Sequence, residues 1–155
     1  MRFFMIAMAL ILLTACGGES DEPLSESDYR SQLVEISQPA LAANGRIGEL
    51  LDEVVARPAL ATNSDWESEY AQSLDTVSAS LDDLRGLNPP PAYAESHKAF
   101  LRAVECSVDG SKRLQESFVD DTGAAIAGVN GFLESCGDLW QDALDAQQQI
   151  TPTAN

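Results

Sequence analysis

Apolar side chains recur every three or four residues along the first half of the chain, which places them on one face of a helix. One stretch carries them at Tyr29, Leu33, Ile36, Ala40, Ala43, Ile47, Leu50 and Val54. A second stretch carries them at Trp66, Tyr70, Leu74, Val77, Leu81 and Leu84. The pattern predicts one helix over about residues 29–54 and another over about 66–84.

The second half of the chain shows the same period in two further stretches. The third predicted helix carries Tyr93, Phe100, Leu101, Val104, Val108, Leu114 and Phe118. The fourth carries Ile126, Val129, Leu133, Cys136, Trp140, Ala143 and Ile150, and a polar tail follows over residues 151–155. No alternating β-branched run, as a strand would have, appears in the sequence. Because short connections make consecutive helices antiparallel, we expect an all-α, up-down-up-down four-helix bundle over residues 28–150.

Prolines and capping residues predict where these helices begin and end. Pro39 falls inside the first helix, where its missing N–H favours a kink; a break with Ser37 capping a restarted helix is the alternative. Pro58 ends this helix. Ser64 and Glu67 have the spacing of a capping box, which predicts the start of the second helix.

The chain begins with Arg2 and an uninterrupted apolar run of eleven residues, 3–13. This order is typical of a signal peptide, and the run is too short to span a membrane, which takes about 20 residues. Residues 13–16, Leu-Thr-Ala-Cys, resemble the lipobox of bacterial lipoproteins. The resemblance implies that residues 1–15 are removed and that Cys16 is acylated, for example with palmitate. An ordinary secretory peptide with a chance cysteine is the alternative.

The charge balance excludes nucleic acid from the expected partners. Nine Lys and Arg residues stand against 25 Asp and Glu, a formal net charge of −16 at pH 7. Phosphate backbones need clustered cations, and anionic lipid headgroups would repel this domain. Residues 16–27 are polar and acidic, so we expect a flexible tether that holds the domain away from the membrane. Solubility explains the acidity better than an acidic binding function does.

The two remaining cysteines, Cys106 and Cys136, form an even pair in what we expect to be an oxidising compartment. The stretch Asp120-Asp121-Thr122-Gly123 predicts a turn between the third and fourth helices. Each cysteine lies fifteen residues from Asp121, so an antiparallel hairpin of these two helices brings the cysteines to the same height. We expect a structural disulfide, with separate unreactive thiols as the alternative. A redox-active pair is disfavoured because such pairs are usually Cys-X-X-Cys. Cys106 lies outside its helix's apolar stripe, so the facing must be oblique, along a flank of small residues, Ala99, Ala103 and Gly110.

Candidate binding residues are few. His97 is the only histidine in the sequence, and a metal site needs several convergent ligands. Tyr93, His97 and Trp140 could border a pocket between helices, although aromatic residues at helical spacing are core in most bundles. The acidic pairs Asp82-Asp83 and Asp120-Asp121 fit solvated helix caps better than calcium ligands. We therefore expect no metal site and no cofactor.

Signatures of catalysis do not appear in the sequence. It contains no Gly-X-Ser-X-Gly, no Cys-X-X-Cys-His and no glycine-rich phosphate loop before a helix. A single histidine also gives no support for a hydrolytic triad. We expect that the protein is not an enzyme.

Residues 90–97, Pro-Pro-Ala-Tyr-Ala-Glu-Ser-His, resemble a stretch of uncharacterised helical-bundle lipoproteins of bacteria. In these proteins a Pro-Pro opens a helix and a histidine follows about a turn and a half later. Together with the lipobox, the resemblance covers roughly residues 28–150 as an architecture. It implies a fold and a location on the extracytoplasmic face of the cell membrane, but no activity.

Three functions remain as hypotheses. The first is a non-enzymatic interaction or scaffold module of the cell envelope, with an envelope protein as partner, motivated by the rod shape and the anchor. The second is a small-ligand sensor or binding protein with a pocket between helices, near Tyr93, His97 and Trp140. The third is buffering of divalent metal ions by the acidic surface.

Overall fold

The computed structural model describes residues 22–148, which fold into four long helices joined by short connections. They are α1 (Glu26–Ala56), α2 (Ser64–Arg85), α3 (Ala94–Asp120) and α4 (Thr122–Gln148), with single 3₁₀ turns at Pro58–Thr62 and Pro91–Tyr93. Over this range there is no strand, and the prediction of an all-helical protein is confirmed. The signal segment, Cys16, Ile150 and the tail lie outside the described residues.

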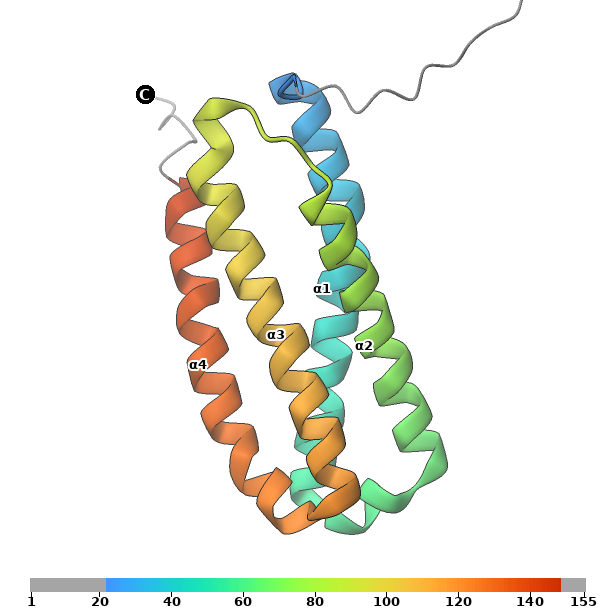
Figure 1. Cartoon of the computed structure of the whole chain (residues 1–155). Coiled ribbons are helices and arrows are strands. Elements are labelled where there is room, and N and C mark those ends of the chain that lie inside the picture. Colours follow the sequence, from blue (N-terminus) through green and yellow to red (C-terminus); the bar gives the residue numbers. More distant parts are fainter. Residues whose placement is uncertain (1–21, 149–155) are drawn as a thin grey trace, which may run out of the picture.

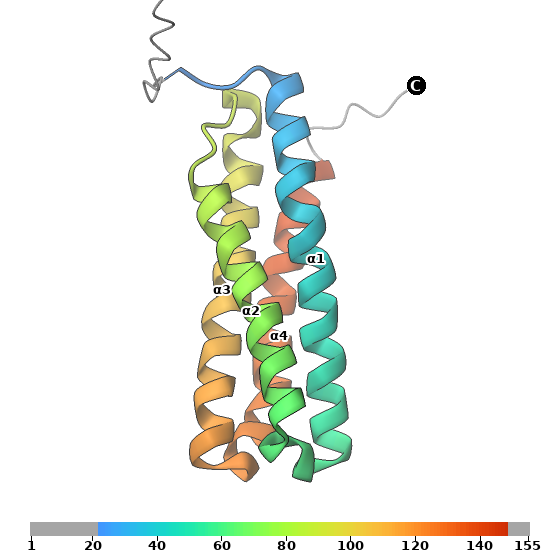
Figure 2. The same cartoon turned by 90° about the vertical axis from the view of Figure 1, so that its right-hand side faces the viewer.

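The four helices lie side by side and the chain reverses direction at each connection (Figure 1). A view turned by 90° shows the same elongated body, with the start of α1 and the end of α4 at one end (Figure 2). The α2–α3 connection is also at this end, where the backbone N–H of Leu24 donates to the carbonyl of Asn88 at 3.0 Å. Helix α1 packs mainly on α2 and α4 mainly on α3, whereas contact between α1 and α4 is slight.

Side-chain caps fix the starts of three helices. Ser25 accepts a hydrogen bond from the backbone N–H of Asp28 at 3.1 Å, at the start of α1. Asn63 Oδ1 accepts from the N–H groups of Asp65 and Trp66 at 2.9 and 3.1 Å. Asp121, between α3 and α4, accepts from the N–H of Ala124 at 3.1 Å. Asp121 is thus a helix cap, as expected for one of the two acidic pairs.

One predicted detail at the helix boundaries is wrong. The cap of α2 is Asn63, not Ser64, which is the first residue of the helix. Both residue types cap well, and the sequence spacing could not separate two adjacent candidates. Helix α1 runs unbroken through Pro39, which removes the alternative of a break. Ser37 does not cap a restarted helix, because its hydroxyl donates to the carbonyl of Leu33 within the same helix.

The predicted apolar stripes of α1 and α2 line the core, which also contains residues from α3 and α4. Polar atoms of the buried aromatic residues are paired across helices. Trp66 Nε1 donates to the carbonyl of Leu50 at 3.1 Å, which joins α2 to α1. The hydroxyl of Tyr70 donates to the carbonyl of Ser111 at 3.1 Å, which joins α2 to α3.

The buried face of α4 follows the predicted stripe except at Leu133. Ala125, Val129, Cys136 and Ala143 are buried, but Leu133 is 45% exposed. Leu133 is exposed because α4 packs mainly on α3, whereas Leu133 borders an open groove beside α1. Close packing of the pair is clearest at Gly110 of α3, where an added Cβ would collide with the ring of Phe132 of α4.

Candidate functional site

The structure joins Cys106 of α3 and Cys136 of α4 in a disulfide, as the sequence predicted. Their Cα atoms are 5.6 Å apart, within the range that a disulfide spans. Ala99 and Ala103, on the predicted small-residue flank of α3, are buried against Ala143 of α4. The small side chains allow the two helices to approach closely. The disulfide therefore forms although Cys106 lies beside the apolar stripe of α3 and not within it.

A cluster of polar and aromatic side chains holds the first turns of α1 against the start of α3. Tyr29 Oη lies 3.1 Å from Nδ1 of His97, and its ring centre is 5.2 Å from that of Tyr93. Arg30 Nε donates to the hydroxyl of Tyr93 at 2.7 Å, and the guanidinium lies 5.4 Å from the Tyr93 ring centre. His97 is only 5% exposed, so the cluster joins two helices and leaves no opening for a ligand at the imidazole.

Burial sets the protonation states in this cluster. It lowers the pKa of His97 below its ordinary value, and a hydrogen bond to the backbone of Leu84 acts in the opposite direction. Burial, together with the neighbouring hydroxyl of Tyr93, raises the pKa of Tyr29 to about 12. At neutral pH both side chains are therefore uncharged and linked by a hydrogen bond, which is the arrangement of a structural contact.

Trp140, the third residue of the predicted pocket, lies elsewhere. Its Nε1 donates to the hydroxyl of Ser107 at 3.1 Å, and its ring meets Phe100 edge to face with centres 5.4 Å apart. The structure thus brings Tyr93 and His97 together but places Trp140 further along the bundle. Neither Tyr93 nor His97 lines either of the two cavities described next.

A groove with a volume of about 180 Å³ lies between α1 and α4. None of its lining residues is charged; they are Leu41, Asn44, Ile47, Gly48 and Leu51 of α1, and Phe132, Leu133 and Trp140 of α4. Leu41 is 55% exposed and Leu133 is 45% exposed. In a chain with a net charge of −16, an uncharged apolar surface of this kind stands out as a binding site.

Sequence reasoning missed this groove, although a signal for it was present. Val34, Leu41, Gly48 and Val55 follow one another at intervals of seven residues, which keeps them on one flank of a helix. This flank is adjacent to the buried stripe of α1, and its three large residues are all exposed. Only the position of α4 shows that the flank borders a groove and not open solvent.

A larger cavity of about 530 Å³ opens between α3 and α4 beside the disulfide. Small residues of α4, Ala124, Gly128 and Gly131, leave the space, and Leu114 and Phe132 form apolar walls. Arg113 and Asp109 lie at its edge. A Cβ added to Gly128 would lie 3.7 Å from the side chain of Leu114, which is an ordinary contact, and a Cβ added to Gly131 would meet no atom within 4 Å. Packing therefore does not require glycine at either position.

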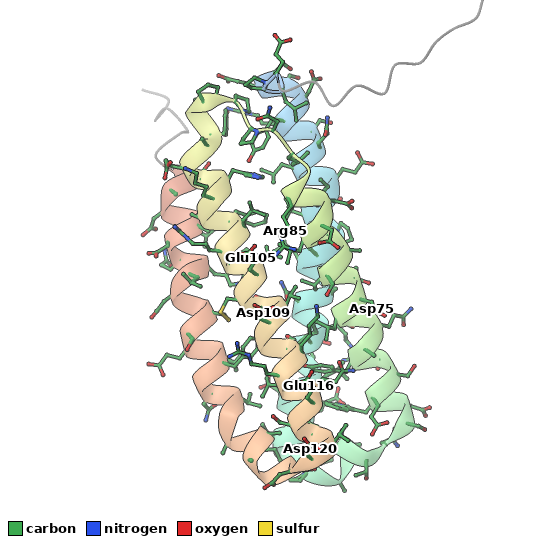
Figure 3. All side chains as sticks on the ribbon, in the orientation of Figure 1. Asp75, Arg85, Glu105, Asp109, Glu116 and Asp120 are labelled. Atoms are coloured by element: carbon green, nitrogen blue, oxygen red, sulfur yellow. A yellow bond between two sulfur atoms is a disulfide. The ribbon has the colours of Figure 1, made fainter. Side chains whose placement is uncertain are left out.

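Carboxylates dominate the face formed by α2 and α3. Figure 3 labels Asp75, Glu105, Asp109, Glu116 and Asp120 there, together with Arg85. Arg85 pairs with Glu105 at 2.9 Å and with Asp82 at 3.2 Å. Within residues 22–148, no group of three His, Cys, Asp or Glu side chains has an arrangement that could hold a metal ion.

None of the helices in the described part of the chain is both long enough and apolar enough to cross a membrane. No protein-family model, no curated protein and no solved structure matches the sequence or the fold. Among the described residues, the uncharged apolar groove between α1 and α4 is the strongest candidate for a functional site.

Proposed function

We propose that the chain is a membrane-anchored extracytoplasmic lipoprotein whose four-helix domain is a non-enzymatic interaction module of the cell envelope. In this proposal residues 1–15 are a cleaved signal peptide, Cys16 carries the lipid, and an up-down-up-down bundle follows a short tether. The observation that carries the interaction function is the uncharged apolar groove between α1 and α4.

The groove supports binding because exposed apolar residues from two helices lie together in it. Single exposed apolar residues are normal on protein surfaces, but Leu41 and Leu133 face the same groove from two helices. A partner that covers them removes apolar surface from water, which is the main favourable contribution to association. The slight contact between α1 and α4 leaves room for such a partner without unpacking the core.

Two observations support the location. The apolar run of residues 3–13, followed by Leu-Thr-Ala-Cys, has the order of a lipoprotein signal. The Cys106–Cys136 disulfide fits an oxidising compartment outside the cytoplasm, because structural disulfides are rare in reducing compartments.

Photo-cross-linking in living cells tests the interaction function. A photoreactive amino acid replaces Leu41 or Leu133 in the groove, and Val119 serves as the matched control because it is 79% exposed but does not line the groove. We expect both groove positions to give one discrete adduct with an envelope protein identified by mass spectrometry. If the adducts from position 119 are the same, or if the groove positions give none, the proposed function is wrong.

The cavity between α3 and α4 favours a second function, binding of a small ligand. Its volume of about 530 Å³ lies within the range of small-molecule sites, and Arg113 at its edge suits a ligand with an anionic group. Replacing Gly128 and Gly131 with Leu would fill this cavity. A metabolite that raises the melting temperature of the wild-type chain but not of the filled variant would support the second function, and an equal shift in both would exclude it.

A further inference from the structure

We infer that the α1–α4 groove binds an amphipathic helix of another protein, with apolar residues on one face and Lys or Arg along both edges. The inference rests on the interaction function proposed above and specifies the chemistry of the partner. Three features of the described residues carry it: the exposed apolar residues along the two helices, the glycines at or near the groove, and the acidic charge of the chain.

Exposed apolar residues continue beyond the groove along both helices. On α1, Val34 and Val55 lie seven residues to either side of Leu41 and Gly48, which line the groove. Seven residues are close to two helical turns, so these side chains extend the same flank. On α4, Leu144 lies eleven residues after Leu133, about three turns, and is also exposed. The groove itself is lined by Leu41 and Leu133, and the exposed apolar residues beyond it continue this spacing, which suits a partner helix with apolar residues every three or four positions.

Glycines border this groove where the packing of the chain does not require them. At Gly45 and Gly48 of α1 and Gly137 of α4, an added Cβ would meet no atom within 4 Å. Glycine is a poor helix former, and alanine would fit at all three positions without a clash. A bound partner would explain these glycines, because a residue without a side chain lets the backbone of the partner approach closely. Gly48 lines the groove directly, and Gly45 and Gly137 lie one turn from Leu41 and Leu133.

The acidic charge of α4 and of the whole chain favours a basic partner. The chain contains no Lys or Arg after Arg113, so α4 has only acidic charges. Glu134 of α4 and Asp52 of α1 are exposed and follow the groove residues Leu133 and Leu51 in the sequence. Neither takes part in any of the ion pairs among residues 22–148. A second copy of the chain, also at −16, would be repelled, whereas Lys and Arg beside the apolar face would be attracted.

The experiment uses the whole chain in phosphatidylcholine nanodiscs, since this net-neutral lipid does not attract a basic peptide. The probes are two synthetic helical peptides of about three heptads, both with Leu at the apolar positions and neither with Trp. One has Lys along the edges and the other has Glu. Binding is followed by Trp emission, because Trp140 lines the groove whereas Trp66 is buried and stacks on Tyr70.

We expect the Lys peptide to shift the emission in a saturable way and to bind more weakly as salt is added. The Glu peptide should bind at least about tenfold more weakly. Leu133→Asp removes apolar surface, and Gly48→Leu keeps the groove apolar but fills it; each should weaken binding by roughly tenfold or more. Val119→Asp is the control and should bind like the wild type. All three positions are outside the buried core, and circular dichroism checks that each variant folds.

Several outcomes would overturn this inference. They are equal binding of the two peptides, unchanged binding by Leu133→Asp and Gly48→Leu, or no saturable signal. Dimerisation of the chain in sedimentation that Gly48→Leu abolishes would show that the occupant is a second copy. If neither peptide binds but the cross-link at position 133 persists, the partner has another chemistry, and the interaction function stands without this inference.

Discussion

The imidazole of His97 lies in surroundings that favour its neutral form. Burial lowers its pKa, and the hydrogen bond to the backbone of Leu84 offsets this only in part. In the unfolded chain the imidazole has its ordinary pKa of about 6.5. As the pH falls below that value, the unfolded state therefore binds more protons than the folded state. The free energy of unfolding must decrease as the pH falls through this window towards the lowered pKa.

Replacing His97 with Gln should remove this contribution, because an amide can keep hydrogen bonds but does not titrate. We expect urea unfolding of the wild type to lose more stability between about pH 7 and pH 5 than unfolding of His97→Gln. Carboxylates titrate in both proteins, so the difference between the two curves isolates the imidazole. Parallel curves would contradict the burial of a neutral His97.

Among the elements, α4 depends most on a single partner. It packs mainly on α3, and Gly128, Gly131 and Gly137 in its interior each lower its helix stability by up to about 1 kcal/mol relative to Ala. The Cys106–Cys136 bond joins positions 30 apart along the chain and compensates by restricting the unfolded state.

The double variant Cys106→Ser, Cys136→Ser should therefore lose about 2–4 kcal/mol of stability. Hydrogen exchange should show the largest loss of protection in α4, since this helix then unfolds locally more often than the others. Ser135→Ala is the matched control, because Ser135 is an exposed neighbour of Cys136 whose hydroxyl bonds only within α4. Equal acceleration of exchange in all four helices would argue against this role of the disulfide.

The sequence predicts those features of the helices that depend on residues close together in the chain, and misses those that depend on how the helices pack. Spacings of three and four residues sufficed for the helices, and the equal distances of the two cysteines from Asp121 sufficed for their pairing. The cap at Asn63 and the exposure of Leu133 in α4 were not predicted. In the second case, period shows that a helix has an apolar face, but which of its apolar residues are covered depends on where the neighbouring helices pack.

The candidate site was harder to predict for the same reason. Tyr29 and His97 are 68 residues apart in the sequence, and no local pattern links them. Trp140 was expected beside Tyr93 and His97, but its distance along the bundle follows from the register of α4 on α3. The α1–α4 groove needs two exposed flanks to face each other, and exposed leucines in a sequence look the same as buried ones.

At the scale of the whole molecule, the proposed lipid anchor gives a direct test. We expect the wild-type chain to incorporate labelled palmitate and to fractionate with membranes, because acyl chains on Cys16 would anchor it firmly. Cys16→Ser should take up no label and should no longer fractionate with membranes as a lipidated chain.

Cys106→Ser is a suitable control for this test, because it removes a cysteine without touching the proposed lipidation site. It should incorporate label like the wild type. Labelling that persists in Cys16→Ser, or that is absent from the wild type, would refute the anchor and leave the groove and the four helices unaffected.

The position of the start of α1 determines how the domain would respond to mechanical load. Tension on the N-terminal segment reaches the helices at the end where Leu24 is bonded to Asn88 and Tyr29 contacts His97. The end of α4 is at the same end (Figure 2), so a pull between the two termini separates α1 and α4 from one end in the manner of a zipper. Contacts loaded one after another yield at lower force than contacts sheared together, so the domain should extend at low force.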